Sequence, residues 1–142
     1  MRFRGFNFLL ALVLAGTIIL VSQETKSVKH STAAATSPAS GKEMFMSYCA
    51  SCHGRDAKGN GPAAAALKQA PADLTGLARQ HRGMYPSDLV TSVLRGQKQL
   101  MAHGDQDMPV WGPLFWKMSQ GHEELVQMRI ANLNKYLESL QE

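Results

Sequence analysis

Two cysteines and a histidine stand close together in the segment Cys49-Ala50-Ser51-Cys52-His53. Two thiols and one imidazole at this spacing match C-x-x-C-H, the attachment sequence of c-type haem. The thiols can add to the two vinyl groups of the porphyrin as thioethers, while the imidazole binds the iron from one side. The sequence therefore predicts one haem c, covalently attached at Cys49 and Cys52, with His53 as an axial ligand.

The same cluster has other possible uses: a structural disulfide, a thioredoxin-like redox pair or half of a zinc site. A thioredoxin-like site requires a strand leading into the motif, but Met44-Phe45-Met46 precedes it without alternation or β-branched residues. A tetrahedral zinc site needs a further ligand from a distant histidine, because the sequence offers no second closely spaced pair. Haem attachment is the favoured interpretation.

A haem that only transfers electrons usually needs a second axial ligand, and a thioether in that place favours ferrous iron. Met108 is the best candidate, because Pro109 disfavours the α conformation at Met108 and places it on an extended loop. The main alternatives are Met101 and His103. Further candidates after the motif are Met84, Met118, Met128, His81 and His122. Of these, Met118 and Met128 lie in stretches with helical spacing, which favours packing in the core.

The N-terminus is typical of an export signal. Met1 to Arg4 is short and positive, and Phe6 to Val21 is almost entirely apolar. Its length lies between that of a cleaved signal and that of a full membrane span, so residues 1–21 are either a signal peptide or an uncleaved membrane anchor. Either alternative places the following domain outside the cytoplasm.

Composition limits what the rest of the chain can be. Residues 22–40 are rich in Ser, Thr and Ala and predict a flexible linker, so of 142 residues only 41–142 remain to form one small domain. The net charge of +4 comes mostly from the first 40 residues. Because the domain is nearly neutral and has no Lys/Arg run interleaved with aromatics, nucleic-acid binding is excluded.

Several stretches outside the motif are also informative: Gly41-Lys42-Glu43-Met44-Phe45, Tyr48, Gly54, Gly59-Asn60-Gly61-Pro62, Met108-Pro109-Val110-Trp111-Gly112 and Tyr136-Leu137. With these stretches, residues 41–142 resemble the class I (mono-haem) c-type cytochrome family of bacteria. The resemblance implies an all-α fold wrapped around one haem, with the first and last helices crossing near Gly41, Phe45 and Tyr136. It also implies a periplasmic location and a proline carbonyl, that of Pro62, which accepts a hydrogen bond from His53. The role of the region from Ala78 to Gly104 is left open.

Capping and spacing place the helices. Ser40 is suited to cap a helix that runs from Lys42 into the motif, and Asp73 to cap a short one through Arg79. A longer helix is predicted from Pro86 to Gly96. The last should run from after Gly121 to about Leu140. Its predicted buried stripe is Leu125, Met128, Leu133, Tyr136, Leu137 and Leu140.

The function that follows is electron transfer rather than enzyme catalysis, with a redox protein as donor and another as acceptor. Trp111 can pack on the haem edge or close the core. Two other functions stay open. One is a catalytic haem with an open sixth position, and the other is a haem that is chiefly structural within a larger assembly. The sequence does not separate a free carrier from an anchored subunit of a respiratory complex, although an uncleaved anchor would favour the second.

Overall fold

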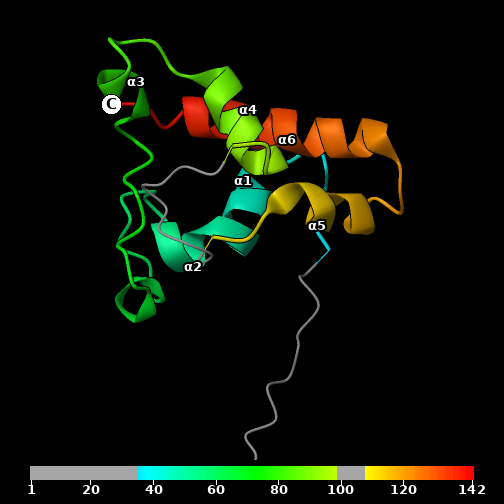
Figure 1. Cartoon of the computed structure of the whole chain (residues 1–142), viewed down its shortest axis with the longest axis horizontal. Coiled ribbons are helices and arrows are strands. Elements are labelled where there is room, and N and C mark those ends of the chain that lie inside the picture. The colour runs from blue at the N-terminus through cyan, green and yellow to red at the C-terminus, as the bar shows by residue number, and fades with distance from the viewer. Residues whose placement is uncertain (1–34, 99–107) are drawn as a thin grey trace, which may run out of the picture. The chain divides into compact units, whose positions relative to one another are not determined.

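The computed structural model describes residues 35–98 and 108–142. The predicted signal or anchor over 1–21, most of the linker, and the alternative ligands Met101 and His103 lie outside these residues. Helices alone make up the regular structure of the described part, which confirms the predicted all-α fold (Figure 1). Among these helices none is long and apolar enough to cross a membrane.

The first helix runs from Ser40 into the C-x-x-C-H motif without a break. Its segments are α1 (Gly41–Met44), the π-helical turn η1 (Phe45–Cys49) and α2 (Ala50–His53). The Ser40 hydroxyl accepts a hydrogen bond from the Glu43 N–H at 3.2 Å, which confirms the predicted cap. Gly54, with a φ of +80°, ends the helix directly after the motif.

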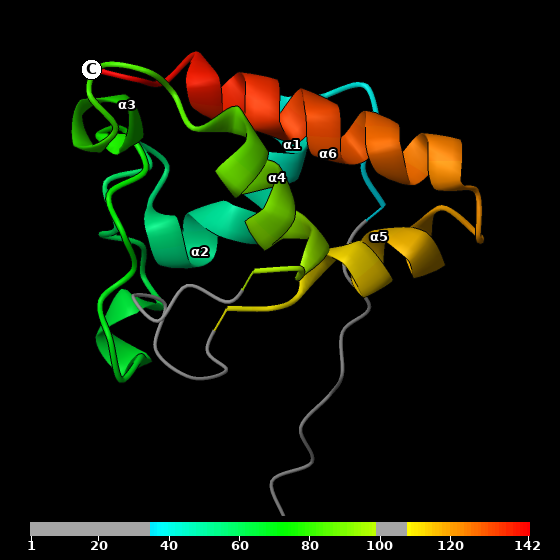
Figure 2. The ribbon, with the colours of Figure 1, turned by 45° about the horizontal axis from the view of Figure 1, so that its top comes forward.

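The helix α6 (Glu123–Glu138) lies against α1, as Figures 1 and 2 show. A side chain on Gly41 would collide with the backbone carbonyl of Asn132 in α6, so only glycine allows the two backbones to come this close. One turn later, the rings of Phe45 and Tyr136 are in contact, with centroids 5.5 Å apart. The predicted crossing of the first and last helices is therefore confirmed.

The buried face of α6 differs in part from the predicted stripe. Leu133 and Leu137 are buried as predicted, but Met128 is 42% exposed, and Val126 and Ile130 lie in the core instead. Met128 stands two residues from both Val126 and Ile130, which is about half a helical turn, so it points to the opposite side. The prediction for Met128 is therefore wrong. Leu125, Tyr136 and Leu140 are half-buried.

The region from Ala78 to Gly104, whose role the sequence does not predict, overlaps α3 (Leu77–Gln80) and includes α4 (Ser87–Arg95). Helix α4 begins directly after Pro86 and ends at Gly96, whose φ is +74°, close to the predicted limits. It is joined to α6 through buried Asn134, which accepts a hydrogen bond from the Tyr85 hydroxyl at 2.7 Å and donates one to Thr91 Oγ1 at 2.8 Å. Burial raises the pKa of Tyr85, which keeps this hydroxyl a donor.

The predicted cap by Asp73 is wrong. Its carboxylate accepts hydrogen bonds from the backbone N–H and the hydroxyl of Thr75, at 2.8 and 2.7 Å, and α3 starts after Gly76 without a side-chain cap. Asp side chains bond readily to the N–H two residues on, and this local turn competes with capping. The turn is held from the other side by Gln141, whose amide donates to the Leu74 carbonyl at 2.8 Å.

The end of the predicted linker, 22–40, packs on the helices. Thr36 is buried, and its hydroxyl is 2.8 Å from the Tyr48 hydroxyl and accepts a hydrogen bond from Arg129 at 3.0 Å. The packed part of the chain thus starts before Gly41. A 3-10 turn, η2 (Ala64–Ala66), and α5 (Trp111–Met118) complete the regular elements of the described residues.

Replacing Gly41 with alanine tests the helix crossing. We expect Gly41→Ala to lower the free energy of unfolding by about 1–3 kcal/mol, because the added methyl group forces α1 and α6 apart. Urea denaturation measures this. The control is Gly76→Ala, whose methyl group would meet only the flexible ends of Arg79 and Gln80. Equal stability of the two variants would contradict the close crossing.

Candidate functional site

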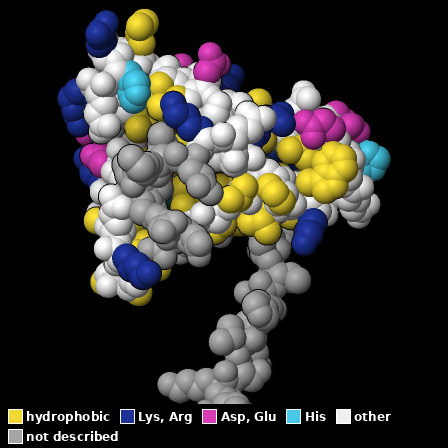
Figure 3. Space-filling view, viewed as in Figure 1, with side chains coloured by type: hydrophobic (Ala, Val, Ile, Leu, Met, Phe, Trp, Pro, Cys, Tyr) yellow, Lys and Arg dark blue, Asp and Glu magenta, His cyan; other side chains and the backbone are white. Residues whose placement is uncertain are grey.

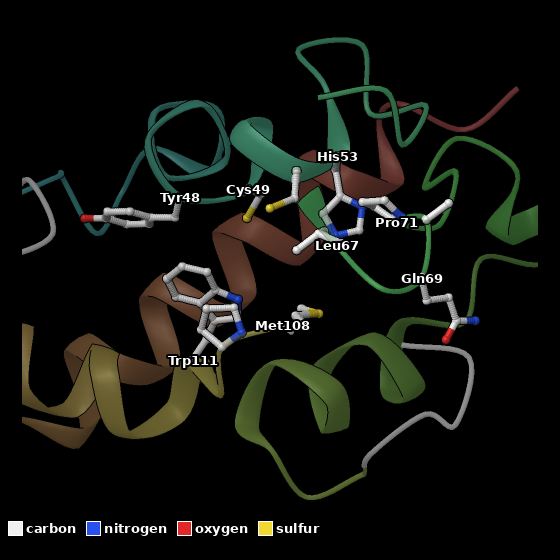
Figure 4. A pocket seen from close by; sticks show the side chains of 11 residues that line it. Tyr48, Cys49, His53, Leu67, Gln69, Pro71, Met108 and Trp111 are labelled. Carbon is white, nitrogen blue, oxygen red and sulfur yellow. The ribbon is translucent and has the colours of Figure 1, made fainter. Parts of the chain in front are cut away.

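A cavity with two lobes lies between the motif, α4, α6 and the start of α5. The lobes measure about 500 Å³ and 600 Å³, including their openings to solvent. Cys49, His53 and Met108 line both lobes, so these three side chains form the seam where the lobes meet. Figure 4 shows the three side chains directed toward the same space. Residues far apart in the sequence are thus brought to one site.

The walls of the cavity are apolar. The first lobe is lined by the ring of Tyr48, by Leu67 and Pro71 from the loop after the motif, and by Trp111. The second lobe lies under α4 and against α6, lined by Leu89, Val90, Val93, Leu94, Leu133 and Leu137 among others. The region with no assigned role therefore supplies one side of the cavity through α4. The sequence predicts this helix but not its role in the cavity, although the apolar spacing of residues 89–94 indicates that one face of the helix is buried.

The two cysteines are free thiols, three residues apart at the start and end of one helical turn. Burial raises the pKa of the Cys49 thiol to about 12, and the nearby Cys52 adds to this effect. A thiol with so high a pKa is protonated at neutral pH, whereas the attacking cysteine of a redox C-x-x-C pair has a lowered pKa. This observation disfavours the thioredoxin-like alternative.

His53 is buried, and its Nδ1 lies 3.0 Å from the carbonyl oxygen of Ala72. A carbonyl only accepts, so Nδ1 carries the proton and Nε2 carries the lone pair that can bind a metal ion. The hydrogen bond also fixes the orientation of the ring. The predicted acceptor was Pro62, and this prediction is wrong.

The reason lies in the path of the loop. Near Pro62 the chain bonds to the end of α2 through the backbone, with Gly61 N–H donating to Cys52 and Ala63 N–H donating to Ser51, at 3.0 and 2.9 Å. The loop then returns, and the Leu74 N–H donates to the Ala57 carbonyl at 2.8 Å. This return brings Ala72 beneath the imidazole.

Met108 lies in non-helical chain before α5, as Pro109 predicts, and its side chain is half-buried on the cavity seam. The other candidates in the described residues do not line the cavity. Met84 is 71% exposed, the imidazole of His122 pairs with Glu124 at the surface, and His81 Nδ1 is 2.8 Å from the Leu77 carbonyl.

Trp111 closes the core, which is one of the two roles predicted for it, and its contact with the haem edge stays a prediction. It is buried, its ring packs on Tyr48 and Phe115 with centroids 5.5 and 5.7 Å apart, and it also forms a wall of the first lobe. Tyr48 was noted only as part of a resemblance. Its position directly before Cys49 is the signal that it belongs to the site.

These residues fit a covalently bound haem. The thiol of Cys49, the oriented imidazole of His53 and the thioether of Met108 lie on the seam between the lobes, and the free thiol of Cys52 lines the first lobe. The apolar walls suit the faces of a porphyrin. Two thiols with an adjacent histidine are what attachment of a c-type haem requires.

Comparison with known proteins agrees with this site. Residues 36–137, more than two thirds of the chain, match the family model described as Cytochrome C oxidase, cbb3-type, subunit III. Searches of curated proteins and of solved structures found no significant match.

A pH-dependent prediction concerns the turn beneath His53. The hydrogen bonds from Thr75 hold the pKa of Asp73 below its ordinary value of 3.8. The ionised carboxylate therefore stabilises the fold above about pH 4, and this contribution is lost as the pH falls through the lowered value. We expect Asp73→Asn to reduce the free energy of unfolding by about 1 kcal/mol at pH 7.

Urea titrations of both proteins between pH 7 and pH 3 check this. The difference between wild type and Asp73→Asn should shrink at the acid end. Glu138→Gln removes an exposed carboxylate from α6 and serves as the control. A difference that stays constant with pH would show that the charge of Asp73 is not involved.

Proposed function

The chain belongs to the family described as Cytochrome C oxidase, cbb3-type, subunit III, and is a class I c-type cytochrome domain, in which we propose that His53 and Met108 bind the iron of one haem c attached at Cys49 and Cys52. Domains of this class carry electrons. One observation supports the ligand assignment above all others: Cys49, His53 and Met108 together form the seam shared by both lobes of the cavity.

His53 and Met108 differ in how they are held, and each arrangement suits its role. The hydrogen bond to the Ala72 carbonyl already fixes the orientation of the imidazole ring. Binding of Nε2 to the iron therefore costs little further rotational freedom of the side chain. The Met108 sulfur is a soft ligand that favours ferrous iron and raises the reduction potential. Haem iron, when bound, supplies a one-electron couple between the ferric and ferrous states.

The rest of the chain sets the surroundings of this couple. Apolar side chains of α4 and α6 line one lobe, and Tyr48 and Trp111 form part of the wall of the other. An apolar environment disfavours the additional positive charge of the ferric state and so raises the potential further. Two fixed ligands also limit structural change between oxidation states.

We further propose that the domain works on the periplasmic side of the bacterial inner membrane, as a carrier or as a tethered redox subunit of a respiratory complex. The export-type sequence of residues 1–21 supports this, and the family name itself refers to a subunit of a respiratory oxidase. Its partners are a redox protein that donates and another that accepts.

A surface near the cavity suits such contacts. Figure 3 shows hydrophobic side chains gathered over α5, where Val110, Leu114 and Trp116 are exposed. Val110 follows Pro109, which lines the cavity. A redox partner can dock transiently on an apolar surface beside the redox centre, so that the distance for electron transfer is short.

The Met108 assignment is tested by Met108→Ala. We expect the ferric protein to lose the weak near-infrared band that arises from sulfur-to-iron charge transfer, and its midpoint potential to fall, because the thioether ligand is gone. Absorption spectra and redox titration measure both. Met128→Ala removes an exposed methionine from α6 and should change neither. An unaltered band in Met108→Ala would refute the assignment.

Covalent attachment is tested separately. Cys49→Ala and Cys52→Ala should each keep one thioether, and the double variant should lose haem on denaturation, because each sulfur holds one vinyl carbon. Denaturing gels stained for haem give the result, with Ser51→Ala, between the two cysteines, as the control. Haem retained by the denatured double variant would contradict the proposed thioether bonds.

A further inference from the structure

Helix α6 buries a positive charge. Arg129 is 6% exposed, and its guanidinium donates to the Ser119 hydroxyl at 3.3 Å, to the Thr36 hydroxyl at 3.0 Å and to the Met44 sulfur at 3.8 Å. All three partners are neutral. Within residues 35–98 and 108–142, no carboxylate forms an ion pair with Arg129.

A buried charge of this kind has a cost in stability. Guanidinium groups keep their charge in proteins, and moving one out of water is unfavourable unless an opposite charge or several hydrogen bonds compensate. Ser119 and Thr36 compensate in part, and both are themselves buried. An uncharged side chain of similar size would pack here without that cost, so the charge itself calls for an explanation.

Contacts connect the guanidinium with residues that line the cavity. Its partner Met44 is followed by Phe45, which lines the second lobe, and Leu133, one turn further along α6, lines the same lobe. Its other partner, Thr36, is within 2.8 Å of the hydroxyl of Tyr48, whose ring lines the first lobe. Two independent chains of contact therefore lead from Arg129 to the two lobes.

We propose that Arg129 is a positioning residue for the redox reaction: a fixed positive charge, held by neutral partners and connected with residues that line the cavity, that raises the reduction potential of the bound haem. This inference rests on the proposed function. A positive charge in a medium of low dielectric acts over a longer distance than one in water. It favours the reduced state, because reduction removes one positive charge from the iron.

The lack of a carboxylate partner among the described residues matters for this role. An ion pair would cancel most of the field of the guanidinium at the haem, whereas hydroxyl groups orient and partly solvate it but leave its net charge in place. Because the charge is buried, dissolved salt screens it only weakly. The effect on the potential should therefore persist at high ionic strength, unlike that of a lysine at the surface.

The experiment compares four variants of the haem-loaded protein by redox titration. Arg129→Met and Arg129→Gln remove the charge, the first with an apolar side chain and the second with an amide that can still donate to Thr36 and Ser119. Arg129→Lys keeps the charge. Lys135→Met removes an exposed positive charge from the same helix and is the matched control.

We expect both neutral variants to shift the equilibrium with a fixed reference couple about tenfold toward the oxidised protein, which corresponds to about 59 mV for one electron. Arg129→Lys should stay near wild type, and Lys135→Met should change the potential much less. The shift should be similar at 0.05 and 0.5 M salt. Two neutral variants guard against one that fails to fold, and urea denaturation reports stability separately from potential.

Potentials unchanged in a folded neutral variant would overturn the inference, and so would an equal fall in Arg129→Lys. Neither result would affect the proposed function, which fails only if the wild-type protein holds no haem or shows no reversible one-electron couple. Thr36→Val separates the charge from the hydrogen-bond chain to Tyr48. A fall in that variant as large as in Arg129→Met would assign the effect to the chain of hydrogen bonds and refute the charge.

Discussion

The contact between Gly41 and the carbonyl of Asn132 is the constraint on which the other elements depend. It lets the first helix lie against the last with no side chain between them, and the pairing of Phe45 with Tyr136 continues this contact. The motif cysteines and His53 follow on the same helix, so their position relative to α6 is set by that one close approach. Helix α4 then packs on α6 from another side through Asn134, and the cavity lies between them.

The side chains proposed to bind and attach the haem depend on different kinds of support. Cys49, Cys52 and His53 stand on a rigid helix, and the imidazole is additionally held by a backbone carbonyl from a loop 19 residues later. Met108 lies outside the helices, just before α5. One side of the proposed haem site is thus held by a helix and the other by a loop residue next to α5.

Sequence analysis predicted the features that depend on local chemistry. The cap at Ser40, the end of α4 at Gly96 and the non-helical position of Met108 all follow from one or two neighbouring residues. Features that depend on distant contacts were missed. The acceptor for His53 is a backbone carbonyl, which leaves no mark in the sequence. Met128 was assigned to the wrong face because the apolar residues of α6 fit two registers, and a buried arginine contradicts the usual preference of its residue type.

The π-helical turn at Phe45–Cys49 and the two lobes beside it have a consequence for how the protein matures. Phe45, Leu94, Leu133 and Leu137 are buried in the hydrophobic core and at the same time line the second lobe. A haem bound as proposed would extend the core through these four side chains, so we expect its attachment and the final packing of the core to be coupled.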